Sequence, residues 1–473
     1  MSDSDDTKSV TFGRRRLLQG LGAGTAALAF PHLWLPGEAR AQTPGRGSVR
    51  HLIYIRLSGG FRFTTAFNSD VADEFNPFGA SDKRAAGTEW GAGKLLERAT
   101  WLDGETNKPR RDLGMKPVTD FTNEMCVLPC VDHEPFSARA DGGHGTGLER
   151  FLTGYVGGAT GFLTLVNYGV RERVKEAASR GITLLPAFSM GEAGMATGAG
   201  DYATYRPPVL EGSGFERFSV DPDSTLPAWA KALPGKMDAR FHARLHTALR
   251  GGVETYQQTR KATSDYGKIF RDPLLRVSSE GQASQEQVDG ISNAELRTLL
   301  GTDGTGQRAA LALRLFHFGC PAVFLNQGGY DYHSREDMEL PNEMDAANRL
   351  VSGLRTALQK MQHPEGGSYW DKTLVVLGSE FGRTTGGSRY NSANGSDHGS
   401  DLATRWMSMP FMGGVITAAG KGGKSLGSVN RSNLKATGQV YSYRSVLKTM
   451  LDMLGADHQG IFPADAPIQD FFA

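Results

Sequence analysis

Two apolar segments joined by a long amphipathic stretch decide the fold: "PAVFLNQ" (321–327) and "TLVVLG" (373–378). Neither segment alternates with polar residues, which favours strands that are covered on both faces, as in a parallel sheet between helical layers. Apolar residues recur between them at steps of three and four, namely Leu340, Met344, Ala347, Val351, Leu354, Leu358 and Met361. The sequence therefore predicts a βαβ unit, in which a helix crosses over from one strand to a parallel one.

The rest of the chain extends this pattern. A helix is predicted at "GQRAALALRLFHFG" (306–319), directly before the first of these strands. Further strand-length apolar runs are "HLIYIRL" (51–57), "MCVLPCV" (125–131) and "ITLLPAF" (182–188). We predict one α/β domain over about 49–473, with a doubly wound, mostly parallel sheet and helices on both faces. Residues 200–305 are polar and hold few strand-like runs, so they are predicted to form a helical insertion or cap.

Composition excludes several classes of partner. The 473 residues carry 52 basic and 51 acidic side chains, so no charge excess favours nucleic acid or an anionic membrane. After the N-terminal region, no window offers the roughly 18 uncharged apolar residues of a membrane span, so no stable membrane insertion is expected. The cysteines are Cys126, Cys130 and Cys320, which leaves either three buried thiols or one disulfide to Cys320.

The N-terminus has the anatomy of an export signal. Arg14 and Arg15 precede an apolar Gly/Ala/Leu stretch that runs to about Phe30. "ARA" (39–41) then supplies a small-x-small cleavage site. We interpret residues 1–41 as a twin-arginine signal peptide, which predicts recognition by the twin-arginine translocase and a periplasmic or secreted mature protein.

Polar side chains follow both strands of the βαβ unit at their carboxyl ends. Asp331 and His333 follow the strand at 321–327, and Glu380 and Arg383 follow the strand at 373–378. Ligands of open parallel sheets gather at this edge. We therefore expect Asp331, His333 and Glu380 to converge on one ion.

Two further segments complete the predicted site. The loop after the second strand adds Asp397 and His398, expected to fold over as a fourth ligand. "DGGHGTGLERFLTG" (141–154) places His144 and Thr146 at a predicted helix start, with His144 on the opposite rim. A mixed carboxylate and imidazole set favours a divalent cation, with zinc or manganese preferred over calcium.

Each of these residues has a structural alternative. Asp331 and His333 could cap the turn after a strand, and Asp397 with His398 could form a solvated turn. Glu380 and Arg383 could be a structural ion pair that closes the strand-to-loop turn, or a ligand with a supporting arginine. Thr146 could be a helix N-cap or a nucleophile.

These motifs resemble a known family. The resemblance rests on Gly329-Tyr330-Asp331-Tyr332-His333, on Ser379-Glu380-Phe381-Gly382-Arg383-Thr384 and on Asp397-His398. In order and spacing they are similar to the twin-arginine-exported bacterial family labelled domain of unknown function 1501, which is grouped with the alkaline phosphatase and sulfatase superfamily. The resemblance covers the export signal and about 306–416. It implies an alkaline phosphatase-like fold, and a metal-dependent hydrolase of phosphate or sulfate esters.

The chain also departs from that superfamily. The metal-binding aspartate that ends the first strand of superfamily phosphatases is Ser58 here, and Phe381 replaces the histidine of an Asp-His pair. Two functions therefore stay open. The first is an exported ester hydrolase, in which Thr146 or a water attacks and Arg383 neutralises developing charge. The second is a non-catalytic exported binding or assembly protein on a degenerate scaffold.

Overall fold

The structure is a computed structural model of the whole chain. It describes residues 46–98, 113–134, 143–210, 266–383, 396, 398 and 405–472, with a few isolated positions between 227 and 244. The chain divides into two compact units, one made of Met1–Pro31 with Pro222–Tyr266 and the other of His32–Asp221 with Gly267–Ala473. The second unit contains the sheet and is the one described below. The predicted signal peptide, 1–41, lies outside the described residues.

One mixed sheet organises this unit. Within the described ranges it has eight strands in the order β4-β3-β5-β1-β6-β7-β2-β8. The strands are β1 (His51–Leu57), β2 (Met125–Asp132), β3 (Phe188–Met190), β4 (Val209–Leu210), β5 (Ala322–Gln327), β6 (Thr373–Gly378), β7 (Trp406–Met412) and β8 (Tyr441–Ser442). Only β7 pairs antiparallel to its neighbours in this described sheet. The predicted α/β class with a mostly parallel sheet is therefore confirmed.

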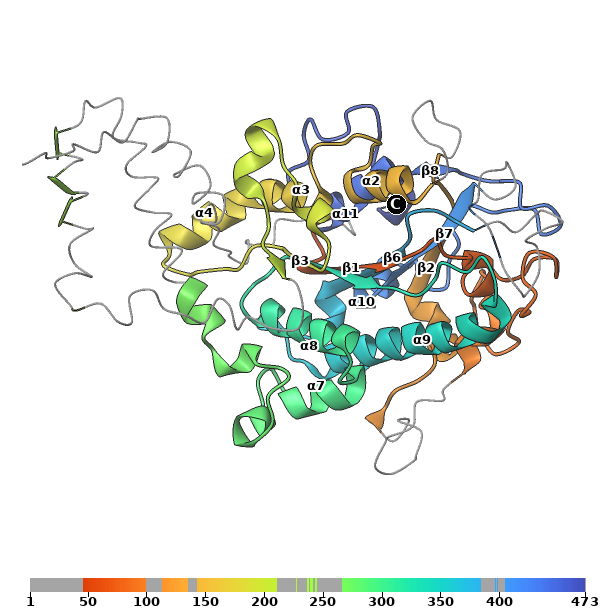
Figure 1. Cartoon of the computed structure of the whole chain (residues 1–473), viewed down its shortest axis with the longest axis horizontal. Coiled ribbons are helices and arrows are strands. Elements are labelled where there is room, and N and C mark those ends of the chain that lie inside the picture. The colour runs from red at the N-terminus through yellow and green to blue at the C-terminus, as the bar shows by residue number, and fades with distance from the viewer. Residues whose placement is uncertain are drawn as a thin grey trace, which may run out of the picture. The chain divides into compact units, whose positions relative to one another are not determined.

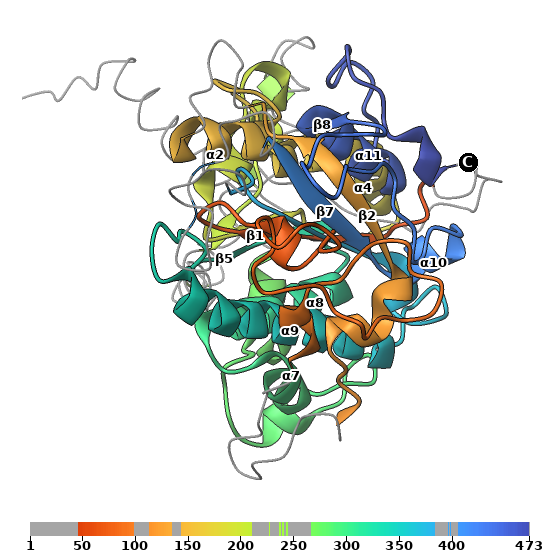
Figure 2. The same cartoon turned by 90° about the vertical axis from the view of Figure 1, so that its right-hand side faces the viewer.

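Helices cover both faces of the sheet. Their bounds are α2 (His144–Thr153), α3 (Phe162–Gly169), α4 (Arg171–Ser179), α7 (Asn293–Leu300), α8 (Gly304–His317), α9 (Glu336–Lys360), α10 (Gly414–Ala418) and α11 (Tyr443–Met453). Figures 1 and 2 show α2, α3, α4 and α11 on one face and α7, α8 and α9 on the other. Both layers are needed because β1 and β6 are buried along their whole length.

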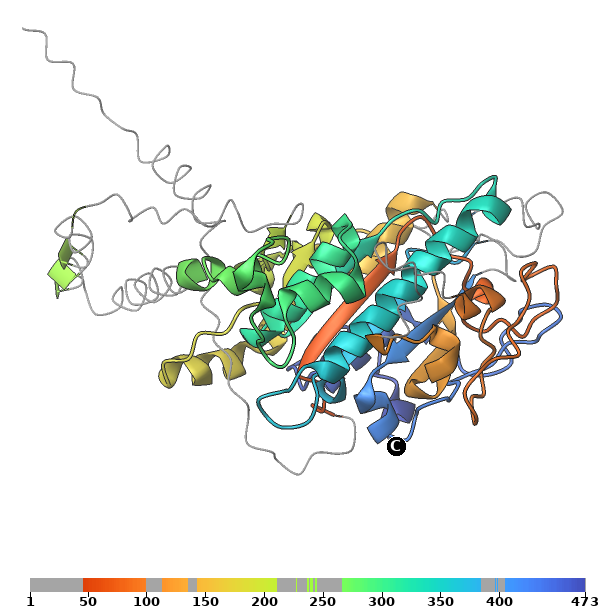
Figure 3. The ribbon, with the colours of Figure 1, turned by 90° about the horizontal axis from the view of Figure 1, so that it is seen from below.

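The predicted βαβ unit is present, with one strand inserted into it. β5 and β6 run parallel, and α9 crosses between them with its predicted apolar face buried. β5 and β6 do not pair with each other, because β1 lies between them and pairs with both. Figure 3 shows α9, in teal, running across this face alongside β1. The carboxyl ends of three parallel strands therefore meet at one edge.

One predicted strand needs correction, and one strand was not predicted. The run at 182–188 was predicted to be a strand, but β3 begins only at Phe188, after Pro186. Proline cannot donate to a ladder hydrogen bond, which fits its position ahead of the strand. β7 was not predicted, although it lies between β6 and β2.

The ends of the predicted insertion, 200–305, belong to the sheet unit. β4 adds an edge strand, and α7 packs against α8 and α9. Most of 211–265 lies outside the described residues, so the insertion itself stays a prediction. All three cysteines are buried free thiols. In the described part of the chain, no helix is long and apolar enough to cross a membrane.

Candidate metal centre

Four side chains gather above the carboxyl ends of β5, β1 and β6. His144, Asp331, His333 and His398 each offer one ligand atom, and these atoms all lie within 4.8 Å of one another. Asp331 Oδ2 lies 3.4 Å from His144 Nε2, and Asp331 Oδ1 lies 3.3 Å from His333 Nε2. The ring centroid of His398 lies 4.5 Å from that of His144 and 5.2 Å from that of His333. This set, which we call the histidine–aspartate cluster, could hold a metal ion.

The cluster faces solvent on one side. The side chains of His144, Asp331 and His333 are 40%, 50% and 48% exposed. His144 Nε2 itself is shielded from solvent and makes no hydrogen bond, although Asp331 lies nearby. A buried imidazole nitrogen without a hydrogen bond is costly unless something binds it. The arrangement therefore combines a nitrogen ready for a ligand with an open approach.

Glu380 lies beneath the cluster and is fully buried. Arg56 donates two hydrogen bonds of 3.0 Å to its carboxylate, and the Gly59 N–H donates a third at 2.8 Å. The Ser379 hydroxyl donates to Oε2 at 3.1 Å, and His144 Nδ1 lies 3.4 Å from Oε1. Burial alone would raise the pKa of Glu380, but the hydrogen bond with His144 and the Arg56 guanidinium hold that pKa well below its usual range.

His144 is oriented by this carboxylate. The hydrogen bond with Glu380 raises the pKa of His144, against the lowering effect of burial, and the charge of Asp331 raises it further. With Nδ1 directed at Glu380, Nε2 is directed at Asp331. At many metal sites one ring nitrogen of a histidine binds the cation, and the other ring nitrogen is hydrogen-bonded to a carboxylate. Glu380 stands in this supporting position behind His144.

Arg383 ties the surrounding loops together. Its side chain is 1% exposed and pairs with Asp331. It also donates to the carbonyls of Gly59, Gly60, Tyr330 and Ser396 at 2.8 to 3.2 Å. One guanidinium thus joins the turns after β1 and β5 to the loop that carries His398.

Two glycines allow these loops to approach closely. Gly59 has a φ of +119°, and a Cβ there would lie 2.5 Å from the Asp331 nitrogen. Gly60 has a φ of +78°, and a Cβ there would lie 2.0 Å from the Phe381 ring. Phe381 is fully buried, and its ring centroid lies 4.6 Å from that of His398 and 5.0 Å from that of His144. It forms an apolar wall beside the histidines.

The family model described as "Protein of unknown function (DUF1501)" matches residues 228–467, about half of the chain. This stretch includes Asp331, His333, Glu380 and His398. The chain belongs to the DUF1501 family. No curated protein matches it.

Solved structures add little to this assignment. Two structures of Ps i-CgsB, one in complex with k-i-k-neocarrahexaose, are 13% and 12% identical to the chain. In each case the match covers 88% of this chain and 74% of the other, with TM-scores of 0.35 and 0.34. At these TM-scores the likeness carries no argument. The alkaline phosphatase-like fold therefore stays a prediction.

The site of this DUF1501 chain differs from the predicted one in two positions. Glu380 was expected among the ligands, but it lies beneath them and is occupied by Arg56 and Gly59. His144 was expected on the opposite rim, but it lies inside the cluster. Asp331, His333 and His398 come together as expected. Asp397 and Thr384 lie outside the described residues.

Two of the structural alternatives raised from the sequence are not what the DUF1501 site shows. Glu380 pairs with Arg56, and Arg383 pairs with Asp331, so Glu380 and Arg383 do not close the turn as an ion pair. The helix α2 begins at His144 with Gly143 as N-cap, so Thr146 is not the cap.

Thr146 and Ser58 do not belong to the histidine–aspartate cluster, although each lies in a segment next to it. The Thr146 hydroxyl, on the first turn of α2, donates to the Gly143 carbonyl at 3.5 Å. Ser58 directly follows β1; its N–H donates to the Gln327 carbonyl, and its C=O accepts from the Tyr330 N–H. The tight packing of α2 depends on Gly147, where a Cβ would lie 3.1 Å from the Glu380 carbonyl oxygen.

Sequence reasoning missed Arg56 as a site residue. The signal was present, because a charged residue inside the apolar run 51–57 needs a buried partner. Arg56 finds two, Glu380 and Glu192, the latter at 3.2 Å.

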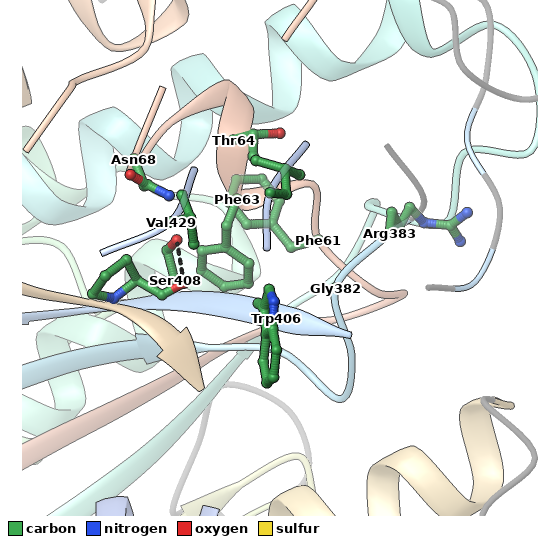
Figure 4. Close-up of a pocket in the computed structure, with 11 residues that line it drawn as sticks. Phe61, Phe63, Thr64, Asn68, Gly382, Arg383, Trp406, Ser408 and Val429 are labelled. Atoms are coloured by element: carbon green, nitrogen blue, oxygen red, sulfur yellow. Dashed lines mark hydrogen bonds between the residues drawn. The ribbon is translucent and has the colours of Figure 1, made fainter. Parts of the chain in front are cut away.

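A second feature near the site is a small pocket beside β7. Figure 4 shows Phe61, Phe63, Trp406 and Val429 around it. Arg383 contributes to the lining, but its guanidinium turns away from the pocket (Figure 4), toward Asp331. The pocket therefore does not receive the charge of Arg383.

Proposed function

We propose that the histidine–aspartate cluster binds one divalent cation and that the protein is a metal-dependent hydrolase of phosphate or sulfate esters. The observation that carries the proposal is the half-exposed cluster whose His144 is braced by the buried Glu380. Around a tetrahedral zinc with ligands at about 2.0–2.1 Å, neighbouring ligand atoms lie roughly 3.4 Å apart. The separations from Asp331 to His144 and His333, 3.4 and 3.3 Å, agree with that value.

The donor set also bears on the identity of the metal. Three imidazoles and one carboxylate suit zinc better than calcium, which takes six to eight oxygen ligands. We therefore favour zinc, with manganese as the second choice. The bound cation would act as a Lewis acid and lower the pKa of a coordinated water.

The chain's own side chains have three roles in this proposal. Glu380 fixes the ring orientation of His144, and Arg383 fixes Asp331 and the loop of His398. Arg383 is a positioning residue here, because its buried guanidinium already donates to four backbone carbonyls and to Asp331. Thr146, on the first turn of α2, or a water is the nucleophile toward the ester.

A second candidate function is non-catalytic binding or assembly on the same scaffold. Ser58 favours it, because this position carries no metal-binding carboxylate that could complete a two-metal clamp. The hydrogen bonds of Arg383 also favour it, since Nε and both terminal nitrogens of that side chain already donate to backbone carbonyls.

The location belongs to the proposal too. The signal-like features of residues 1–41 support a periplasmic or secreted location of the mature protein. A small-molecule or polymeric ester would be its substrate there.

Metal analysis of the purified mature protein tests the binding site. We expect about one zinc per chain, lost in His333→Ala and in His398→Ala but kept in His458→Ala, which changes a histidine on another surface. Chelation should lower the melting temperature of the wild type, because the cation binds only the folded state, and should leave that of His333→Ala unchanged. A wild-type protein without metal, and indifferent to chelators and added zinc, would overturn the site.

Turnover of aryl phosphates and aryl sulfates separates the two functions. If the hydrolase proposal is right, both histidine variants lose turnover, and Thr146→Ala loses turnover while it keeps the metal. Full metal content without turnover of either ester class would favour the binding protein.

A further inference from the structure

A cavity beside α8 and α9 is lined by charges of both signs, of which Arg308 and Glu343 make no ion pair among the described residues. It lies at the carboxyl end of β5 and has a volume of about 280 Å³. Small-molecule sites typically have roughly 300–1,000 Å³, so this cavity suits a ligand at the small end of that range. Its lining includes Arg308 from α8 and Glu343 from α9, with Leu300, Ala346 and Leu350 as apolar surface.

Arg308 is a half-buried cation without an ion-pair partner among the described residues. One terminal nitrogen donates to Thr305 Oγ1 and to the Asn326 carbonyl, each at 3.3 Å, and Nε is buried without a hydrogen bond. The nearby carboxylate of Asp303 is used elsewhere, because it caps α8 at Thr305 and Gly306. It also pairs with Arg349.

Glu343 is the corresponding anion. Its carboxylate packs against the backbone of Gly329, where a Cβ would lie 2.8 Å from Glu343 Cδ. No hydrogen bond or ion pair to this carboxylate occurs within the described ranges. Burial, and then the charge of Glu339, raise the pKa of Glu343, so a cationic partner would stabilise its charged form.

The charges decide between classes of ligand. A simple anion that reached Arg308 would also face Glu343 and Asp303, and a simple cation at Glu343 would face Arg308 and Arg349. A neutral polyol would leave both half-buried charges without a counter-charge. A ligand with one negative and one positive group offers a counter-charge to both Arg308 and Glu343.

We propose that this cavity binds a small zwitterion, an α-amino acid with an aliphatic side chain. Its carboxylate pairs with Arg308, its ammonium group pairs with Glu343, and its side chain packs on Leu300, Ala346 and Leu350. The inference does not rest on the proposed hydrolase function. It places a second site on the connection that starts at Gln327 and leads to Asp331 and His333.

Binding of L-leucine to the full mature protein, followed by calorimetry, tests the proposal. L-leucinamide lacks the carboxylate, and N-acetyl-L-leucine lacks the ammonium group. Each should bind the wild type roughly tenfold or more weakly than leucine does, since each loses one charge-assisted contact. Arg308→Gln should weaken leucine but not leucinamide, and Glu343→Gln should weaken leucine but not N-acetyl-leucine.

Matched controls come from the same chain. Arg276→Gln and Glu286→Gln remove exposed charges away from the cavity and should leave leucine binding unchanged. If Arg308→Gln does not fold, Arg308→Lys keeps the positive charge and should keep the preference for leucine over leucinamide. No leucine binding at millimolar concentration, tighter binding of either analogue, or binding of D-glucose in place of leucine would each overturn the proposal.

Discussion

At the scale of single residues, the site depends on charges that sit outside the ligand set. Glu380 touches no solvent, yet it sets the orientation of His144 and receives both hydrogen bonds of the Arg56 fork. The ion pair with Arg56 helps to offset the energetic cost of burying Glu380. Metal affinity and fold stability are therefore coupled through one carboxylate.

Glu380→Gln should change both metal affinity and fold stability. It should weaken zinc binding about 10- to 100-fold, because a lost supporting carboxylate typically costs that much. It should also lower the unfolding free energy by about 3 kcal/mol, because Arg56 keeps its charge but loses its buried partner.

The double variant Arg56→Met with Glu380→Gln is the control. It should recover part of the unfolding free energy in urea titrations, while zinc competition assays still show weak binding. Normal zinc affinity in the double variant would show that Glu380 does not support His144.

A pH dependence is expected from Glu336, the first residue of α9. It is buried 3.2 Å from Arg62, and burial outweighs the attraction of that arginine, raising the pKa of Glu336 from 4.5 to about 7. The folded chain then holds this proton over a range in which the unfolded chain has released it. Between pH 4.5 and 7 the unfolding free energy of the wild type should fall as pH rises, relative to Glu336→Gln.

The size of that fall is on the order of 3 kcal/mol at most. Urea unfolding of both proteins across this pH range measures it. A difference that stays flat or grows with pH would mean that Glu336 is ionised against Arg62 in the folded protein.

At the scale of elements, the turn after β1 must pass between the turn after β5 and Phe381. Gly60→Ala should cost about 2–5 kcal/mol of unfolding free energy, from the strain of a positive φ and from the clash with the buried ring. Gly181→Ala is the matched control, since Gly181 has a similar φ of +76° but no atom within 4 Å of its added Cβ. Thermal melts should place the control within about 1–2 kcal/mol of the wild type. If Gly60→Ala and Gly181→Ala lose the same unfolding free energy, contact with Phe381 does not constrain the turn.

The elements also show what the sequence could reveal. The runs at 51–57, 125–131, 321–327 and 373–378 contain strands, because their burial on both faces is visible as mostly apolar runs without regular polar alternation. β7 was missed because "WMSMPFM" mixes serine and proline with methionine, a weak strand pattern.

The site was predictable only in part for a similar reason. Asp331 and His333 follow a strand whose direction fixes them, whereas His144 reaches the cluster by the packing of α2 on Glu380 and Phe381. That packing joins segments more than 200 residues apart in the sequence. No local pattern encodes it, so neither the inward position of His144 nor the pairing of Glu380 with Arg56 could be read from spacing.

At the scale of the whole molecule, the predicted export route can be tested without any assay of activity. Replacing Arg14 and Arg15 together by lysine keeps the charge but removes the paired arginines that the translocase reads. We expect unprocessed chain to accumulate in the cytoplasm, measured by fractionation and by the mass of the mature N-terminus. The same chain with Lys8→Arg is the control. Normal processing after Ala41 in the double lysine variant would show that the segment is not a twin-arginine signal.

The position of β1 between β5 and β6 also has a consequence for synthesis on the ribosome. β1 ends at Leu57, but its partners begin at Ala322 and Thr373. At roughly 5–20 residues per second, on the order of 15 to 50 seconds pass before either partner is made. During that time an apolar strand has both edges open, so nascent chains arrested before residue 320 should be protease-sensitive at 51–57 and should need a chaperone to stay in solution. Chains arrested after β6 has left the ribosome tunnel should be protected there, and early protection would mean that β1 first pairs elsewhere.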